Sequence, residues 1–267
     1  MSDAAFAADW LGLREPVDHR SRAEALSDAL AAEGRRRGWS RALDLGSGTG
    51  SNVRYLDPRL PWIRRWTLVD HDPALLARVR DSERDRPLER VTGDLAVEGL
   101  AAVRGADLVT ASALLDLVSE AWLEDLVQAC RATGAGALFT LTYDGRTQWS
   151  PGEEGDDEIR AAVNRHQERD KGLGSALGPG ATAVAEQLFR EAGYRTEIAA
   201  SPWILQGPPD AALALRLTEG WAAAAAEVED ADDAFVQDWL RRRRDRLAAG
   251  HFRVTVGHRD LLALPGS

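Results

Sequence analysis

The chain carries a short apolar run at 42–45 that is followed by three glycines at alternate positions, Gly46, Gly48 and Gly50. An apolar run that gives way to closely spaced glycines is typical of a buried strand entering a tight turn. Glycine has no Cβ and readily adopts positive φ, so a ligand can lie against the backbone of such a turn and meet its N–H groups. The stretch therefore predicts a nucleotide-like ligand at a strand-to-helix crossing of an α/β fold.

The spacing of these glycines bears on which nucleotide would bind. Counted from Gly46, the third small position of the dinucleotide fingerprint G-x-G-x-x-G falls on Ser51, and Gly50 stands one place too early. The chain also offers no credible partner for hydride transfer. An NAD-dependent enzyme is therefore the disfavoured alternative.

Length and charge narrow the class of protein further. At 267 residues the chain suits one α/β domain with insertions, and two full domains are not expected. A formal net charge of -10 and a pI near 5.1 argue against a surface built to neutralise nucleic-acid phosphates. Small-molecule chemistry is therefore the better interpretation.

The single cysteine, Cys130, excludes a disulfide framework and a multi-cysteine metal site within the chain, and no metal is predicted. Because it lies in an apolar helical register, Cys130 is expected to be buried rather than reactive. The N-terminus lacks a basic segment followed by an apolar core, and no apolar run is long enough to span a bilayer. We therefore expect a cytoplasmic protein with no membrane partner.

Strand-like and helix-like patterns alternate along the chain. Predicted strands lie at 42–45, 66–70, 90–94, 106–110, 136–143, 194–199 and 252–264. Predicted helices lie at 22–37, 119–132 and 183–192, and two more lie within 208–249. This alternation implies parallel βαβ units, with a ligand crevice at the carboxyl edge of the sheet.

A carboxylate closes the second predicted strand. Asp70 lies about twenty positions beyond Gly50, at the tip of the strand that neighbours the glycine turn. An acidic side chain at this place can accept both ribose hydroxyls of a bound nucleoside. Asp70 is therefore the second independent sign of a nucleoside-containing ligand.

The run D-x-G-x-G-x-G from Asp44 to Gly50, with Asp70 beyond it, resembles motif I of the class I S-adenosylmethionine (SAM) dependent methyltransferases. The resemblance covers residues 40–145 and the closing strands, somewhat more than half of the chain. It implies a doubly wound, mostly parallel seven-stranded α/β sheet whose last strand lies antiparallel beside the fifth. It also implies that the chain is an enzyme, that SAM is its cofactor and that methyl transfer is its activity.

The resemblance gives each matching residue a role. The glycines would approach the methionine and ribose parts of SAM, while Asp44 would orient the turn or the amino group. Asp70 would hold the ribose hydroxyls. Asp94 with Leu95 would contact the adenine, and Ser112 would lie beside the methyl group. For Asp44 and Asp94, a plain turn or capping role is the alternative. The full predicted cofactor-binding set is Asp44, Gly46, Ser47, Gly48, Gly50, Asp70, His71, Asp94, Leu95 and Ser112.

Three segments lie outside the matching region of a chain that is expected to form one domain over 1–267. The N-terminal segment 1–38 is expected to be helical, and its mixed aromatic and charged first part stops at Pro16. The polar segment 143–180 is predicted to be a lid, because a segment of this length between a strand and its helix is usually functional. The segment 208–249 is predicted to be a helical insertion before the last strand, so that both insertions wall a substrate pocket.

The implied reaction is an in-line displacement of the sulfonium methyl group by an O, N or S nucleophile. Alignment and exclusion of water matter more for such a transfer than an elaborate catalytic apparatus. A hydroxyl or protonated amine acceptor also needs a base. The predicted base is His166, because imidazole titrates near neutral pH, with Tyr143 and Asp144 as rivals at the fifth strand tip. The histidines at 71, 251 and 258 look no better placed.

A small-molecule metabolite is the predicted methyl acceptor. The sequence after the fourth predicted strand, T-A-S-A-L-L-D, lacks the Asn/Asp-Pro-Pro-aromatic pattern common in adenine amino methylation, and Cys130 has no Pro-Cys pair for cytosine chemistry. Arginines 241–244 are interpreted as a salt-bridged exposed helix rather than an RNA-binding surface. RNA or protein methyl transfer is therefore the weaker interpretation. A non-catalytic SAM-binding or partner-binding module of the same fold is the main alternative. The sequence leaves the oligomeric state open, a homodimer included.

Overall fold

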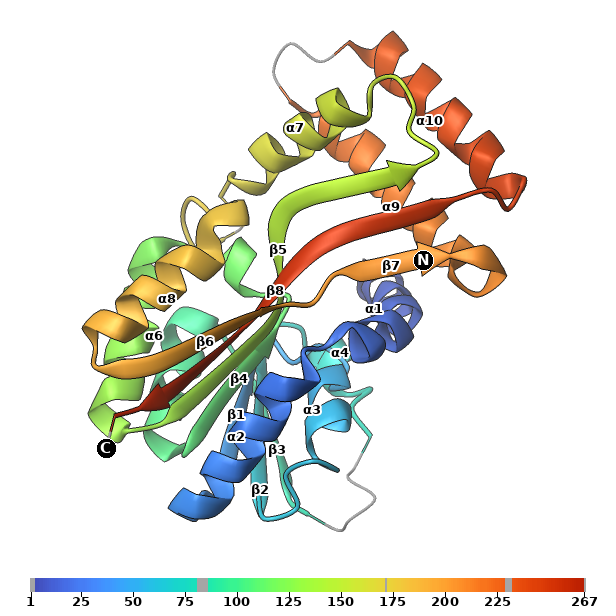
Figure 1. Ribbon diagram of the computed structural model, residues 1–267. Coiled ribbons are helices and arrows are strands. Elements are labelled where there is room, and N and C mark those ends of the chain that lie inside the picture. The colour runs from blue at the N-terminus through green and yellow to red at the C-terminus, as the bar shows by residue number, and fades with distance from the viewer. Residues whose placement is uncertain (1–2, 81–85, 171, 229–231, 267) are drawn as a thin grey trace.

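The computed structural model describes residues 3–80, 86–170, 172–228 and 232–266. Within them, one eight-stranded sheet has the order β3-β2-β1-β4-β5-β8-β6, with β7 paired to β8 (Figure 1). The strands are β1 (Arg41–Leu45), β2 (Arg65–Asp70), β3 (Leu88–Thr92), β4 (Leu108–Ser112), β5 (Gly136–Ser150), β6 (Tyr194–Ala200), β7 (Trp203–Gln206) and β8 (Arg253–Pro265). Strands β1 to β5 run parallel, and β8 lies antiparallel between β5 and β6. The predicted mostly parallel sheet with an antiparallel last strand beside the fifth is confirmed.

Helices flank both faces of the sheet (Figure 1). The α-helices are α1 (Asp3–Ser21), α2 (Glu24–Arg37), α3 (Ser51–Leu56), α4 (Pro73–Leu76), α5 (Leu100–Ala102), α6 (Glu120–Thr133), α7 (Asp156–Gln167), α8 (Ala181–Glu191), α9 (Gly207–Ala226) and α10 (Asp233–Ala248). Shorter helical turns of other kinds are η1 (Leu95–Gly99), η2 (Val103–Gly105), η3 (Leu115–Leu117) and η4 (Gly178–Gly180). None of these helices is both long enough and apolar enough to cross a membrane.

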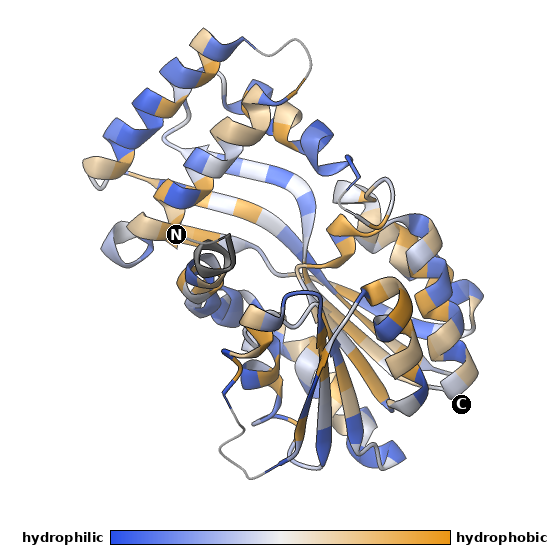
Figure 2. Cartoon of the chain, turned by 180° about the vertical axis from the view of Figure 1, so that it is seen from behind, coloured by the Kyte–Doolittle hydropathy of each residue, from blue (hydrophilic) through white to orange (hydrophobic). Residues whose placement is uncertain are grey.

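Alternating side chains of the central strands build two cores, one on each face of the sheet. On β1, Ala42 packs with α2 and α3, whereas Leu43 packs with α6 and α8. The same alternation separates Leu138 from Phe139 on β5. Successive side chains of a strand point to opposite faces, so a strand that is covered on both faces is apolar throughout. Figure 2 shows this concentration of hydrophobic residues in the strands. Cys130 is fully buried in the α6 core, as predicted.

Strand β5 runs on to Ser150, past its predicted end at Tyr143. The extension pairs with the first half of β8, so that Trp149 lies opposite Val254. Its pairing partner comes far later in the chain, and a local pattern carries no sign of it. The first part of the segment 143–180, which the sequence predicts as a lid, is therefore strand.

A third core lies between this strand extension and a layer of helices formed by α7, α9 and α10 (Figure 1). The ring of Trp149 meets Trp221 of α9 and Trp239 of α10 edge to face, at centroid distances of 5.9 and 6.3 Å. Aromatic pairs prefer such arrangements. The predicted helical insertion before the last strand thus consists of α9 and α10, and it packs on the strands as a cap.

The described sheet has one strand more than the seven predicted. The additional strand, β7, pairs antiparallel with β8 and buries Trp203 and Leu205, while Ile204 faces outward. Four residues of period two, next to a proline, cannot be told from a loop by their pattern alone. The strand exists because β8 is long enough to pair with both β6 and β7 on the same side.

Helix α1 passes through Pro16, where the sequence predicts a stop. Proline in a helix interior costs about 3 kcal/mol because it removes a backbone hydrogen bond. Packing offsets this cost, since α1 contacts α3, β7 and α9, and Val17 is buried in the third core. The prediction of a stop was wrong because tertiary packing outweighs local propensity here.

The arginines of α10 are held by carboxylates, which confirms their interpretation as a salt-bridged helix. The pairs are Arg241–Asp238, Arg242–Asp238, Arg243–Asp156, Arg244–Glu219 and Arg246–Glu153. One of them differs from the expectation of exposure: the side chain of Arg243 is 2% exposed and its guanidinium lies over the ring of Trp149 at 4.4 Å. The basic run therefore fastens the cap and does not form a free cationic surface.

A buried carboxylate on β8 ties several elements together. Asp260 is 1% exposed, and its Oδ1 accepts hydrogen bonds from Leu141 N at 2.8 Å and Ser201 Oγ at 2.6 Å. Its Oδ2 accepts from Ala23 N at 2.9 Å and lies 4.0 Å from Arg22 Nε. Buried charges persist where they are paired and hydrogen-bonded in this way. The carboxylate therefore fixes the start of α2, the middle of β5 and the β6–β7 connection to β8.

We expect Asp260→Ala to lower the free energy of unfolding by about 3–5 kcal/mol, because it leaves a buried guanidinium and several donors without their acceptor. Urea denaturation measures this loss. The control is Asp245→Ala on α10, whose carboxylate is 73% exposed and 3.6 Å from Arg241, and which should change stability by about 0.5 kcal/mol or less. Equal losses in the two variants would contradict the assigned role of Asp260.

Candidate functional site

The turn between β1 and α3 has a left-handed backbone at every glycine. The φ angle is 62° at Gly46, 52° at Gly48 and 82° at Gly50. This region costs a residue with a Cβ roughly 1–2 kcal/mol. Ser47 N donates to a carbonyl near the end of β2 at 3.2 Å, and Ser47 Oγ donates to Asp44 O at 2.7 Å. The predicted tight glycine turn is confirmed.

Two neighbouring segments approach the Cα atoms of the turn closely. A Cβ built on Gly48 would lie 2.8 Å from Leu11 Cδ1 of α1. A Cβ on Gly46 would lie 3.3 Å from Leu114 Cδ1, in the segment after β4. The N-terminal helix and the segment after β4 therefore stand on either side of the turn.

Asp70 holds the turn from the tip of β2. Its Oδ2 accepts a hydrogen bond from Gly48 N at 2.7 Å, and its Oδ1 accepts one from Asp72 N at 2.9 Å. Each carboxylate oxygen can accept a second hydrogen bond from a ligand. His71 lies next to it with Nδ1 3.5 Å from Asp70 Oδ1, and its side chain is 86% exposed. Asp70 thus supports the turn and can also meet a ligand.

Asp44 lies beneath the turn and is 1% exposed. Its Oδ1 accepts hydrogen bonds from Asn52 Nδ2 at 2.6 Å and Thr110 Oγ1 at 2.8 Å. Burial raises the pKa of this carboxyl to about 6, although the hydrogen bonds oppose the rise. These contacts favour the role of orienting the turn, which the sequence leaves open beside a ligand contact.

Asp94 caps the helical turn that follows β3. Its Oδ1 accepts a hydrogen bond from Ala96 N at 2.6 Å, and the residue is exposed. This is the capping role that the sequence analysis names as the alternative to adenine binding. The next residue, Leu95, lines a cavity beside the glycine turn.

A cavity of about 300 Å³ opens beside the turn. Its walls come from α1, the glycine turn, the tip of β2 and the segment after β4. The lining residues are Trp10, Leu11, Arg14, Asp18, Gly46, Ser47, Gly48, Thr49, Ser51, Asn52, Asp70, His71, Leu75, Leu95, Ser112, Ala113, Leu114 and Leu117. Of the predicted cofactor set, the cavity includes Gly46, Ser47, Gly48, Asp70, His71, Leu95 and Ser112 and leaves out Asp44, Gly50 and Asp94.

Helix α1 supplies one wall of this cavity, which the sequence analysis does not anticipate. Arg14 Nε and Nη2 donate to Asp18 at 2.9 and 3.2 Å, and the guanidinium lies 4.9 Å from the ring centroid of Trp203. Trp203 Nε1 in turn donates to Asp18 Oδ1 at 3.1 Å. The available signal was the mixture of aromatic and charged residues before Pro16, which suits neither a plain surface helix nor a core helix.

Two of the predicted base candidates contact charged side chains away from the cavity. His166 Nε2 lies 3.0 Å from Glu227 Oε2, between α7 and α9. Asp144 pairs with Arg146 and lies 3.6 Å from Arg259 Nε. Neither residue lines the cavity, so the structure does not bring these two beside the predicted cofactor residues.

The third candidate, Tyr143, does not line the cavity either and belongs to a buried polar cluster. Its hydroxyl donates to Asn164 Oδ1 at 2.8 Å, and its ring lies 6.2 Å from that of His258. Burial raises the pKa of Tyr143 and lowers the pKa of His258 to about 3, so both groups are neutral near pH 7. His258 was not predicted to be a site residue, because it comes to lie beside Tyr143 only through the pairing of β8 with β5.

Asp116 was not predicted to be a site residue, and it does not line the cavity, although its neighbours Leu114 and Leu117 do. It is 6% exposed and lies in η3, the turn after β4. Burial raises its pKa to about 6, opposed by the Arg14 guanidinium and by the backbone N–H of Tyr143. The sequence shows Asp116 directly after the fourth predicted strand, but a single Asp in a leucine-rich turn does not reveal whether its side chain is buried.

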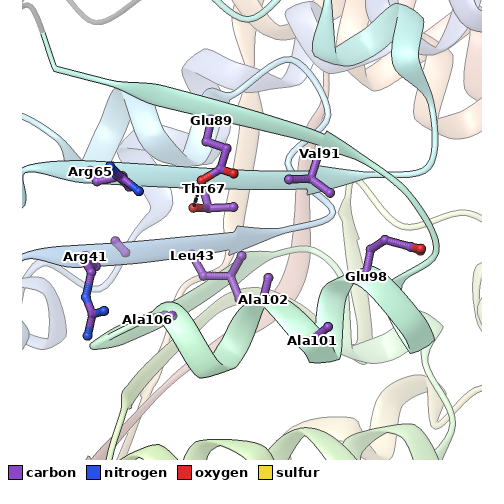
Figure 3. Close-up of a pocket in the computed structure, with 12 residues that line it drawn as sticks. Arg41, Leu43, Arg65, Thr67, Glu89, Val91, Glu98, Ala101, Ala102 and Ala106 are labelled. Carbon is purple, nitrogen blue, oxygen red and sulfur yellow. Dashed lines mark hydrogen bonds between the residues drawn. The ribbon is translucent and has the colours of Figure 1, made fainter.

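Figure 3 shows a second hollow, of about 500 Å³, on the face of strands β1 to β3. Arg41, Arg65 and the segment 98–106 line it, and Thr67 Oγ1 donates to Glu89 Oε2 at 3.2 Å across two strands. It is larger than the cavity at the strand tips, but it contains no glycine turn and no predicted site residue. The smaller cavity is therefore the candidate site.

No protein-family model matches this chain, and no curated protein matches it. Similar solved structures include the YcgJ protein from Bacillus subtilis, with 10% identity, a TM-score of 0.49 and coverage of 91% of this chain and 100% of that one. Precorrin-6y C5,15-methyltransferase from Geobacter metallireducens shows 14% identity, a TM-score of 0.45 and coverage of 89% and 87%. Phosphoethanolamine N-methyltransferase 2 from Haemonchus contortus, in complex with S-adenosylhomocysteine, shows 13% identity, a TM-score of 0.42 and coverage of 90% of this chain and 53% of that one. Because these identities and scores are low, the fold assignment rests on the strand order itself.

We expect Gly48→Ala to distort the turn, because alanine is strained at a φ of 52° and its Cβ would press on Leu11. The free energy of unfolding should fall by roughly 1–2 kcal/mol in thermal or urea denaturation. The control is Gly220→Ala in α9, where a Cβ meets nothing within 4 Å and alanine should stabilise the helix slightly. A Gly48→Ala protein as stable as the parent would contradict the assigned geometry.

The pH dependence of stability tests the burial of Asp116. Its folded pKa, about 6, lies above the unfolded value of about 3.9, so the folded state binds more protons between these values. This carboxyl therefore makes stability fall as pH rises from about 4 through 6, by at most about 3 kcal/mol. Asp116→Asn has no such loss, so its free energy of unfolding relative to the parent should rise by up to that amount between pH 4 and pH 8. A difference that is constant with pH would refute the assignment.

Proposed function

We propose that this chain is a SAM-dependent methyltransferase that acts on a small-molecule acceptor. The observation that supports it most strongly is the contact of Gly48 N with Asp70 Oδ2 at 2.7 Å, beside a cavity at the carboxyl ends of β1, β2 and β4. Open α/β sheets bind ligands in this crevice, where the strand order reverses. The D-x-G-x-G-x-G run and the strand order together support a class I methyltransferase.

The groups around the cavity suit the parts of SAM. Asp70 can accept hydrogen bonds from two ribose hydroxyls. Leu75 and Leu95 offer apolar surface to the adenine on the β3 side, while the open backbone of the glycine turn and Ser112 lie on the methionine side. When bound, SAM supplies a methyl group that is activated on a sulfonium. The chain itself has to bind and orient SAM and the acceptor, and it has to exclude water.

The acceptor would enter between α1 and the segment 112–117. Trp10 and Leu11 form an apolar wall there, and such a wall excludes water from a displacement that depends mainly on alignment. A cavity of about 300 Å³ matches the size of small-molecule sites. Together with the net charge of -10, this size favours a metabolite over a polymer as the acceptor.

The proton-transfer role proposed for His166 and Asp144 from the sequence loses support. Both side chains contact residues outside the cavity, His166 contacting Glu227 and Asp144 contacting Arg146. No described residue of the segments 143–180 and 208–249 lines the cavity. Acceptor recognition is therefore assigned to α1 and the segment after β4.

We expect Asp70→Ala to weaken binding of SAM and of S-adenosylhomocysteine by about 10- to 100-fold, because hydrogen bonds to a carboxylate are worth about 1.5–3 kcal/mol. Isothermal titration calorimetry measures both affinities. The control is Asp157→Ala on α7, whose carboxylate is 80% exposed and which should bind both ligands as the parent does. If the parent binds neither ligand at millimolar concentration, the proposed function is wrong.

A further inference from the structure

Arg14 lines the cavity with one edge of its guanidinium open. Its Nε and Nη2 donate to Asp18 at 2.9 and 3.2 Å, so the Nε–Nη2 edge is occupied by a carboxylate. Its Nη1 donates to no group in the part of the chain that the structure describes, and it is not among the buried polar atoms that lack a partner. Nη1 is therefore in contact with solvent, and the Nη1–Nη2 edge can donate to a ligand.

The guanidinium of Arg14 is held in a fixed position. The side chains of Arg14 and Asp18 are only 14% and 10% exposed. The guanidinium lies 4.9 Å from the ring centroid of Trp203, whose Nε1 donates to Asp18 Oδ1 at 3.1 Å. A planar donor that is already oriented in this way loses little conformational freedom when it meets a ligand. Arg14 is therefore a preorganised donor in the cavity wall and differs from a flexible surface arginine.

Arg14 and Asp70 lie toward opposite ends of the cavity. In the strand order, β2 lies on one side of β1, whereas β7, which pairs with β8, lies on the other. Asp70 is the last residue of β2, and Arg14 lies over Trp203 of β7. A ligand whose hydroxyls meet Asp70 would extend from there toward Arg14. The site thus has a hydrogen-bond acceptor at one end and a cationic donor at the other.

A carboxylate is the anion that suits the open edge of Arg14. The two parallel N–H groups of a guanidinium edge match the two oxygens of a planar carboxylate. Arg14 is the only Arg or Lys among the described residues that line the cavity, and Asp18 already offsets part of its charge. A doubly charged phosphate would lack a second cation here. The charge balance therefore favours a singly charged group.

We propose that Arg14 binds a carboxylate of the bound ligand through its Nη1–Nη2 edge, with Asp18 and Trp203 as positioning residues. Two ligands can bring this group to the site. The methionine part of SAM carries a carboxylate, and the methyl acceptor can carry one as well. The inference rests on the proposed function and deepens it, because it gives the end of the site opposite Asp70 a chemical preference.

Binding of two forms of the product cofactor tests the first source of the carboxylate. Isothermal titration calorimetry compares S-adenosylhomocysteine with its decarboxylated analogue, which keeps the adenosine, the sulfur and the amine. The parent protein should bind S-adenosylhomocysteine about tenfold more tightly, as expected for charge-assisted hydrogen bonds. In Arg14→Gln this preference should fall to about twofold or less, while the affinity for the decarboxylated analogue stays within about twofold of the parent value.

Two further variants separate recognition from a structural role. Arg14→Lys keeps the charge but lacks the planar edge, so it should retain part of the preference. The matched control is Arg20→Gln, because Arg20 lies on the same helix and also pairs with a carboxylate, Asp210, but does not line the cavity. This control should keep the full preference. If Arg14→Gln weakened both forms of the ligand equally, Arg14 would only tie α1 to β7, and the inference would fail.

Binding of matched acids and amides tests the second source. The protein is saturated with S-adenosylhomocysteine, and ligand-observed NMR compares phenylacetate with phenylacetamide, indole-3-acetate with indole-3-acetamide, and cyclohexanecarboxylate with cyclohexanecarboxamide. If the acceptor brings the carboxylate, at least one acid should bind about tenfold more tightly than its amide, and Arg14→Gln should abolish that difference. Arg20→Gln should leave it unchanged.

The two series together decide the inference. A preference that depends on Arg14 in the first series assigns the carboxylate to the cofactor, and one in the second series assigns it to the acceptor. If neither series depends on Arg14 although S-adenosylhomocysteine binds, the inference is overturned and the proposed methyltransferase remains. If the parent protein binds neither SAM nor S-adenosylhomocysteine, the proposed function fails together with the inference.

Discussion

The glycine turn keeps its shape because a network of buried, hydrogen-bonded polar side chains lies beneath it. Arg22 Nη1 donates to Asn52 Oδ1 at 2.8 Å, and Asn52 Nδ2 donates to Asp44 Oδ1 at 2.6 Å. Thr110 Oγ1 reaches the same Asp44 oxygen at 2.8 Å, and Arg22 faces Asp260 on β8. The corner between α1 and α2, helix α3 and strands β1, β4 and β8 are thereby joined. Moving any one of these elements would leave buried polar groups without hydrogen-bond partners, so the turn is preorganised for a ligand.

Helix α1 lines the cavity together with the glycine turn. Glu15 accepts two hydrogen bonds from Arg54 of α3, at 2.7 and 2.6 Å, and His19 Nε2 lies 3.1 Å from Ser51 Oγ. On its other side the helix is held to β7 through Trp203. The same helix thus contacts the glycine turn on one side and β7 and α9 on the other. A ligand between α1 and the turn would have the glycines and Asp70 on one side and Trp10 and Leu11 on the other.

Local sequence patterns predict what depends on neighbours along the chain, and they miss what the fold brings together. The glycine spacing and Asp70 are local, because a turn and a strand tip need few residues to specify. Strand β7 and the extension of β5 past Tyr143 exist because β8 pairs with them from far along the chain. The wall that α1 adds to the cavity likewise depends on the packing of this helix against α3 and β7. The sequence was therefore sufficient to predict the glycine turn and Asp70 on one side of the cavity, whereas the wall formed by α1 needed the tertiary structure.

A crystal structure of the protein with S-adenosylhomocysteine tests the central claim most directly. We expect the ribose hydroxyls within hydrogen-bond distance of Asp70, the adenine against Leu95, and the homocysteine part between the glycine turn and Ser112. The sulfur should face the segment that carries Asp116. Density for the nucleoside in the hollow on β1 to β3, or a ribose that does not contact Asp70, would contradict the account.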